Sequence, residues 1–290
     1  MYNILCEGVD QDMKKILAAA LTLMMILSGC QFIEKEEEDL PSYTYTEEAE
    51  YDTIRWDPVT LKVEKSYLTT KERNYAAQQV ESAVQAAKSF LSEVELNDVE
   101  LVLRNGSGAT MVYEGYAEIF YAQNRDIPYT SIITQIMAGV EGVPEWLREG
   151  VGAYAADINK ESMLKTWGHM IESLNRYVEM QTEMQEDSSD LIEEHYYTID
   201  ELAQVLYKNN DYMQAQELGD MADQIASIGY AQEAYNYRGA YCIYAGSFVK
   251  YLEKNYSRGQ ILQVYQGADF EEVMGISFEE ARQNWLTSLQ

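Results

Sequence analysis

The sequence predicts an α+β fold in which a small unit of strands and one helix precedes a helical half. Two observations support this prediction. Short runs of alternating apolar and polar residues are confined to the chain before residue 128, whereas apolar residues at helical spacing dominate after it. With 290 residues, of which 47% are hydrophobic, the chain is long enough for one sizeable core. We therefore expect a single domain over residues 53–290, with an α/β part at 53–127 and a helical part at 128–290.

In the first half, the alternating segment VTLKVEKSYLT at 59–69 predicts a strand. The segment 70–94 has apolar side chains at helical spacing, and Thr70 with Glu72 close behind it is typical of a helix start. Further strands are predicted at 99–105, 109–115 and 116–124. We expect the strands to pair mostly antiparallel.

The second half predicts a series of helices, at 128–139, 144–159, 160–185, 198–208 and 234–256, with short helices over 258–289. The first two have a proline near their first turn, where the missing N–H costs nothing. The helix at 234–256 is the most apolar and aromatic of the chain. Its tyrosine stripe, which includes Tyr241 and Tyr244, favours core packing over a sugar-stacking platform.

The N-terminus carries the most specific signal of the chain. From Met13 it reads MKKILAAALTLMMILSGC, with two lysines, a short apolar run and small residues before Cys30. This order is typical of a secretory signal, and the apolar run is shorter than the roughly 20 residues that span a bilayer. The ending LSGC resembles the bacterial lipobox, which implies that Cys30 receives a lipid and begins the mature protein.

The lipobox divides the N-terminal region into two predicted parts. Residues 1–29 would be an upstream extension and a signal peptide, with Met13 as the favoured start. Residues 30–52 are acidic and without periodicity, which favours a solvated tether. We therefore expect the protein at the extracytoplasmic face of a bacterial cell membrane, attached through the lipid on Cys30.

The charge of the chain excludes one class of partner. The formal net charge is −28, and nucleic-acid binding needs basic residues that displace counterions from phosphates. The remaining cysteines are Cys6, in the predicted extension, and Cys242, in an apolar helix. With Cys30 lipidated, Cys242 has no partner for a disulfide, and we expect it to be a small buried side chain.

Two short blocks in the second half resemble a known family. VPEWLREGVGAYAAD at 143–157 looks like the glutamate helix of the Glu-zincin-like "peptidase MA" family, and the segment from AYCIYAGSFV to GISFEEARQNWL is similar to its C-terminal part. The resemblance implies a zincin-like fold and places Glu149 at the position of the third zinc ligand. In that family, two histidines and a general-base glutamate on the preceding helix complete the site.

The sequence departs from that pattern where the chemistry needs it most. The preceding helix reads SIITQIMAG, with Thr134 and Gln135 at the positions of the first histidine and the glutamate, and Ala138 at the second histidine. The only two histidines of the chain, His169 and His195, both follow Glu149. A lone carboxylate does not hold zinc at useful affinity. We therefore predict no metal, no cofactor and no catalytic residue, but a vestigial cleft lined by Thr134, Gln135, Ala138 and Glu149.

These observations predict a cell-envelope lipoprotein whose metallopeptidase-like domain is catalytically inactive. Its expected role is to bind a peptide, a protein or a wall component. One alternative is an active hydrolase with a non-metal carboxylate site, since paired acids abound in so acidic a chain. The other is a purely structural envelope lipoprotein without a ligand.

Overall fold

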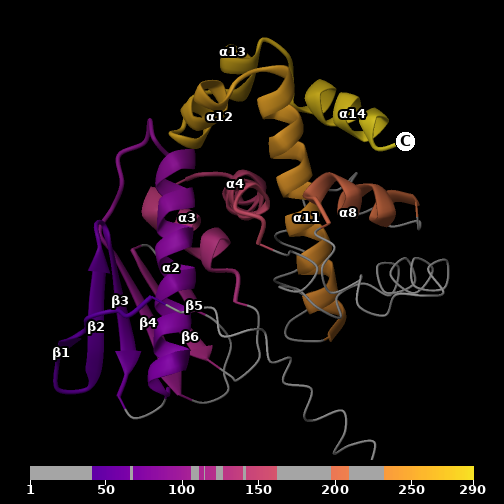
Figure 1. The fold of residues 1–290 in the computed structure, drawn as a ribbon. Helices are drawn as coiled ribbons and strands as arrows, with labels where there is room; N and C mark the ends of the chain where they lie inside the picture. The colour runs from indigo at the N-terminus through magenta and orange to yellow at the C-terminus, as the bar shows by residue number, and fades with distance from the viewer. Residues whose placement is uncertain are drawn as a thin grey trace, which may run out of the picture. The chain divides into compact units, whose positions relative to one another are not determined.

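The computed structural model describes residues 41–65, 68–105, 111–113, 115–121, 127–139, 142–161, 197–208 and 232–290. Over these residues the chain forms one six-stranded sheet followed by helices, which confirms the predicted α+β class (Figure 1). The strands are β1 (Thr46–Glu47), β2 (Tyr51–Trp56), β3 (Val59–Glu64), β4 (Val99–Asn105), β5 (Met111–Tyr113) and β6 (Tyr116–Tyr121). The helices are α2 (Thr70–Phe90), α3 (Tyr129–Ala138), α4 (Glu145–Ile158), α8 (Ile199–Leu206), α11 (Gln232–Asn255), α12 (Arg258–Tyr265), α13 (Phe270–Met274) and α14 (Phe278–Ser288).

Some predictions concern residues outside the described ranges. The signal peptide, Cys30 and the first part of the tether (residues 30–40) lie before residue 41, and the predicted helix at 160–185 and the loop with His195 fall almost wholly in 162–196. Among the described residues, no helix combines the length and apolar character that crossing a bilayer requires.

The sheet is mixed, with strand order β1-β2-β3-β4-β6-β5. The outer pairings are antiparallel, as expected, but β3–β4 and β4–β6 at the centre are parallel. Parallel neighbours need a crossover, and α2 supplies it between β3 and β4. Helices α2 and α3 contact the same sheet, and the apolar side chains of β3 and β4 are buried there.

The folded part begins before residue 53, inside the range assigned to the tether. Strand β1 lies wholly in that range, and β2 begins at Tyr51. The alternation of β2 is hard to detect because Asp52 occupies a buried position, where its carboxylate pairs with Arg73. Ahead of β1, the hydroxyl of Tyr43 donates to Glu81 Oε2 at 2.6 Å, and that of Tyr45 donates to the carbonyl of Arg73 at 2.8 Å. The chain is therefore anchored to α2 from Tyr43 onwards.

The anchor formed by Tyr45 gives a testable pH dependence. Burial raises the pKa of Tyr45 from 10.0 to about 12, opposed by Arg73 and reinforced by Asp52. Because the folded pKa is the higher one, the stabilisation is fully present below pH 10 and is lost as the pH rises towards 12. We expect Tyr45→Phe to be less stable than the wild type at pH 8, with a gap that narrows between pH 10 and 12. Thermal unfolding across this range checks it, and a constant gap would contradict it.

Reciprocal capping boxes set the beginnings of two helices, α2 and α8. Thr69, one residue before the predicted start, caps α2, and Glu72 completes a capping box by accepting from the Thr69 backbone. The same reciprocal bonds join Thr198 and Glu201 at the start of α8. Both helices therefore begin where the local sequence satisfies their first N–H groups.

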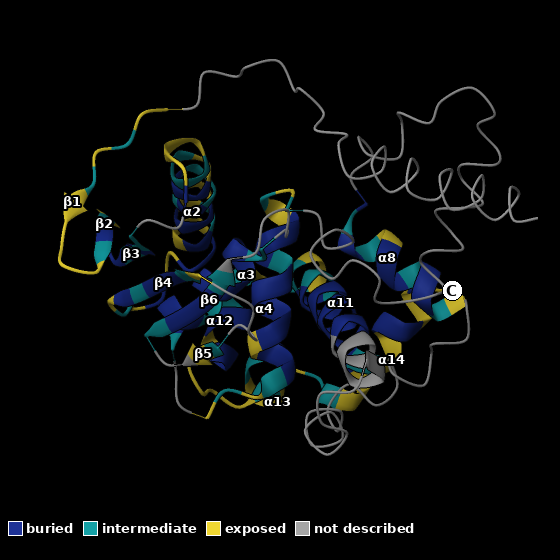
Figure 2. Ribbon diagram, turned by 90° about the horizontal axis from the view of Figure 1, so that it is seen from below, coloured by how far each residue is buried: buried dark blue, intermediate teal, exposed yellow. Residues whose placement is uncertain are grey.

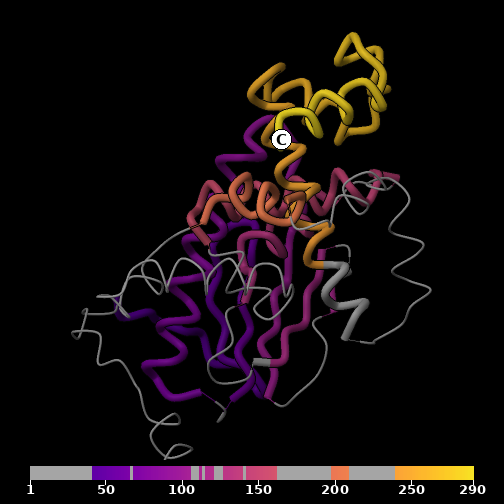
Figure 3. The backbone as a smooth tube through the Cα atoms, turned by 90° about the vertical axis from the view of Figure 1, so that its right-hand side faces the viewer, coloured from indigo at the N-terminus to yellow at the C-terminus, as the bar shows by residue number. Residues whose placement is uncertain are grey.

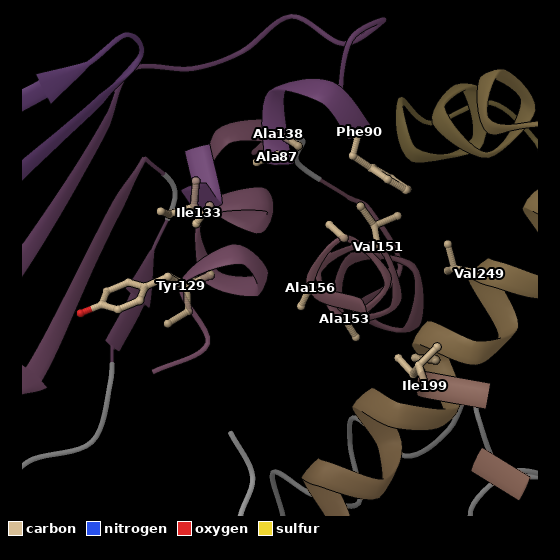
Figure 4. Packing of buried hydrophobic residues seen from close by; sticks show 14 of the residues in the cluster. Ala87, Phe90, Tyr129, Ile133, Ala138, Val151, Ala153, Ala156, Ile199 and Val249 are labelled. Atoms are coloured by element: carbon tan, nitrogen blue, oxygen red, sulfur yellow. The ribbon is translucent and has the colours of Figure 1, made fainter. Parts of the chain in front are cut away.

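Helix α4 lies at the centre of the helical half and packs against α3 and α11 (Figures 1 and 2). In the close view, Val151, Ala153 and Ala156 of α4 lie among side chains of the neighbouring helices (Figure 4). Three glycines bring the helices together: Gly150 and Gly152 on α4, and Gly246 on α11. A Cβ at any of them would meet a neighbouring helix within 3.0 Å, so these contacts are close.

The C-terminal helices α12 to α14 gather at the end of the described domain away from most of the sheet (Figure 3). An aromatic cluster fixes α13 and α14 to α4 and α11, and its members are Trp146, Phe248, Phe270, Phe278 and Trp285, with neighbouring ring centroids 5.1–6.3 Å apart. Tyr241, Tyr244 and Phe248 are almost fully buried, which confirms packing as their role. Each ring buries a large apolar area, so the cluster contributes strongly to the core.

A second set of contacts, which we call the ionic junction, joins α4, α8 and α11. Asp157 Oδ2 lies 3.1 Å from Lys250 Nζ, and its Oδ1 accepts from the backbone N–H of Ile199 at 2.9 Å. Asp200 pairs with the same lysine at 3.3 Å and accepts from Ser247 at 2.8 Å. Ser247 is buried, and its oxygen also accepts a hydrogen bond from the indole N–H of Trp285. Its role is therefore to hold neighbouring helices together. The junction holds α8 against the centre of the domain.

Candidate functional site

The structure brings together two of the four residues predicted to line a vestigial cleft. Gln135 on α3 donates from Nε2 to Oε2 of Glu149 on α4 at 3.2 Å. Glu149 is 5% exposed, and Gln135 is partly buried. The contact arises because α3 and α4 pack closely, and both side chains lie on the facing sides of their helices.

The described contacts of Thr134 and Ala138 are with residues other than Glu149 (Figure 4). Thr134 is fully buried, and its hydroxyl donates to the carbonyl of Thr130 one turn earlier, at 2.6 Å. Ala138 is also buried and lies towards Ala87 of α2 (Figure 4). The polar contacts that lead to the glutamate come from positions 131 and 135, which are four residues apart and share one face of α3.

Ser131 is the first residue at this site that sequence reasoning missed. It is 3% exposed, and its Oγ accepts from Gln135 Nε2 at 3.3 Å. One amide nitrogen thus lies between the Ser131 hydroxyl and the Glu149 carboxylate. The spacing of four residues from Gln135 was a usable signal, but it required the correct helix register.

Cys242 on α11 is the second missed residue. As expected, it is buried, but its thiol also donates to Oε2 of Glu149 at 3.4 Å. Cys242 and Glu149 are 93 positions apart. No local pattern predicts this contact, because only the packing of α11 on α4 creates it.

Tyr265 of α12 adds an electrostatic neighbour. Burial raises the pKa of the Tyr265 phenol well above its ordinary value; Arg148 opposes this rise, and the negative field of Glu149 adds to it. The phenol therefore stays neutral at physiological pH.

We name the group Ser131, Gln135, Glu149 and Cys242 the α3–α4 polar cluster.

Gly152 makes room for this cluster on the α4 side. A Cβ built at Gly152 would lie 2.9 Å from both Gln135 Nε2 and Ser131 Oγ, and 3.0 Å from the carbonyl oxygen of Ser131. Contacts this short are not tolerated without a shift of the neighbours. The absence of a side chain at this position therefore lets the hydroxyl and the amide approach α4.

The residues of the cluster do not fit a catalytic zinc ion. Such a site takes three strong protein ligands, usually imidazoles and a carboxylate, and leaves one position for water. Here α3 offers a hydroxyl and an amide, and the amide directs its N–H at the carboxylate. Among the described ranges, no group of three or more His, Cys, Asp or Glu is placed to hold a metal ion. His169 and His195 lie outside those ranges.

One hollow on the described surface lies away from this cluster, between α2, α4 and α12. It is lined by Phe90, Ile158, Asn159 and Arg258 among others, and has a volume of about 160 Å³. Ligand sites usually enclose roughly 300–1,000 Å³. Arg258 lies over the Phe90 ring at 4.7 Å and pairs with Glu253 at 2.7 Å, so this cation already has structural contacts. The hollow does not make a ligand site.

Comparison of the sequence with protein-family models gives no match, and comparison with curated proteins gives none either. The function is therefore inferred from the residues of the chain and from their contacts.

Proposed function

We propose that the protein is a cell-envelope lipoprotein, anchored through Cys30, whose metallopeptidase-like domain is inactive and binds a peptide, a protein or a wall component. The observation that carries the proposal is the hydrogen bond from Gln135 to Glu149, in the place where the resemblance implies a metal. The LSGC motif supports attachment to the membrane through Cys30. The net charge of −28 supports a partner other than nucleic acid.

The chemistry of the cluster argues against hydrolysis by a metal-bound water. That mechanism needs an ion with an open position and a general base beside it. An amide has no basic site at physiological pH, and a serine hydroxyl is a weak ligand for zinc. Glu149 is also buried under the neighbouring helices, so a substrate bond does not reach it without a rearrangement. Any partner is therefore expected to bind on the surface of the domain.

A second candidate is a purely structural envelope lipoprotein. It is favoured by the packing of the site: Thr134 is fully buried, and Glu149 accepts hydrogen bonds from two other helices. A space filled in this way leaves little for a ligand to occupy. The two candidates share the anchor and the inactive domain, and they differ only in whether a partner binds.

Metal content and peptidase activity of the purified full chain test the proposal. We expect far less than one zinc ion per chain after dialysis, and no peptide hydrolysis that a chelator abolishes. Cell fractionation tests the proposed membrane attachment. The wild type should fractionate with membranes, and Cys30→Ala should not. Stoichiometric zinc together with chelator-sensitive peptidase activity would refute the inactive domain. Pull-down with isolated cell wall and with envelope proteins separates the binding role from the structural one.

A further inference from the structure

The α3–α4 polar cluster has the layout of a metal site with the wrong donors. Ser131 and Gln135 project from one face of α3, and Glu149 meets them from α4. Two side chains four residues apart on one helix, with a third from a facing helix, is an arrangement that holds zinc when the side chains are strong ligands. The described contacts thus define three ligand positions, of which one carries a ligand.

The fourth position is already supplied by α11. The thiol of Cys242 lies 3.4 Å from the same Glu149 oxygen that Gln135 contacts. Thiolate and carboxylate are both zinc ligands, with metal distances of about 2.3 Å and about 2.0–2.2 Å respectively. Glu149 and Cys242 thus supply two of the four zinc-ligand positions. The amide of Gln135 lies between Glu149 and Ser131.

We infer that the cluster is a polar replacement for a four-coordinate metal site, in which Gln135 and Cys242 donate hydrogen bonds to Glu149, Ser131 accepts one from the same Gln135 amide, and an ion becomes unnecessary. The carboxylate is buried, and an unpaired buried charge is costly, so it needs either donors or a cation. The amide N–H and the thiol provide donors. This inference concerns the interior of the domain and does not depend on the envelope address or on any partner.

The inference makes a specific prediction about conversion. Ser131→Cys replaces a hydroxyl by a thiol of similar size, and Gln135→His replaces the amide by an imidazole. Together with Glu149 and Cys242, these substitutions complete a set of four zinc ligands. In the full chain, we expect the double variant to retain about one zinc ion per chain after dialysis and to melt at a higher temperature with zinc than with a chelator. The wild type, measured in parallel, accounts for zinc held by Cys6 and Cys30.

Two controls test the assigned positions. Thr134→Cys with Ala138→His places the same two ligands four residues apart on α3, but at positions that make no described contact with Glu149: Thr134 donates to the Thr130 carbonyl, and Ala138 is one turn further along the helix. This variant should hold no more zinc than the wild type. Adding Glu149→Gln to the Ser131→Cys, Gln135→His variant should remove most of the bound zinc, because it removes one of the four ligands.

The outcomes separate clearly. A folded double variant without extra zinc, or equal zinc at positions 134 and 138, would overturn the inference. If circular dichroism shows that the double variant does not fold, Gln135→His alone decides, since its imidazole joins Glu149 and Cys242 in a set of three ligands. Extra zinc in that variant supports the inference, and none overturns it. Stoichiometric zinc in the wild type that Glu149→Gln removes would also overturn the inference, because the native cluster would then hold an ion.

Discussion

Replacing Gly150 with alanine is expected to destabilise the domain by about 2 kcal/mol, which corresponds to a fall in Tm of about 4–8 °C. The added Cβ would lie 2.6 Å from the carbonyl oxygen of Ala245 and 2.7 Å from Cγ2 of Val249. The first obstacle is backbone, so α4 and α11 must move apart. This cost exceeds the gain of up to about 1 kcal/mol that alanine brings in a helix interior.

A matched control exists on α12. Gly259 is also helical, but a Cβ there would meet only the tip of the Glu93 side chain, at 3.2 Å. That side chain can swing into solvent, so Gly259→Ala should leave Tm unchanged or slightly raised. Thermal unfolding of both variants checks the prediction. Equal effects at the two positions would show that α4 and α11 do not approach as closely as described.

Replacing Asp157 with alanine is expected to cost about 2 kcal/mol. The substitution removes the acceptor of the Ile199 N–H at the start of α8 and one of the two carboxylates around Lys250. The loss is limited because Lys250 keeps Asp200 and remains partly exposed to water. Chemical denaturation at pH 7.5 measures the change.

Two further substitutions separate the parts of the ionic junction. Asp157→Asn keeps an acceptor for the backbone N–H and should cost less than Asp157→Ala. Asp200→Ala should cost about 1 kcal/mol, because the Asp200 side chain is 42% exposed. If Asp200→Ala proves the more damaging of the two alanine substitutions, the junction does not work through Asp157.

The junction also predicts how this cost depends on pH. Burial lowers the pKa of Lys250, but Asp157 and Asp200 outweigh it and raise the pKa above its ordinary value of 10.5. A raised pKa means that the stabilisation is fully present below pH 10.5 and is lost as the pH rises through the folded value. The difference between the wild type and Asp157→Ala should therefore shrink above pH 10.5.

Much of the fold was predictable because it depends on local patterns. Strand β3 shows the alternation of a sheet with one buried face, and α2 shows helical spacing over 21 residues. The parallel pairings at the sheet centre were not predicted. Strand direction depends on where the crossover helix returns the chain, and no local pattern of apolar residues records that.

The candidate site was predictable only in part. The pattern around Glu149 predicted a helix there, and the structure brings Gln135 of the predicted set into hydrogen-bond contact with it. The contacts of Thr134 and Ala138 were not predictable, because a helix with nine of its ten residues buried has no polar face that reveals its orientation. Ser131 and Cys242 became visible only through their contacts.

The sequence by itself determined which ligand types exist. It holds two histidines, both after Glu149, so the His-Glu-x-x-His motif is excluded whatever the fold. Only the tertiary structure decided which side chains surround Glu149. That choice depends on the rotation of α3 about its axis and on the approach of α11, 93 residues away, and both are set by packing at small residues such as Gly150 and Gly152.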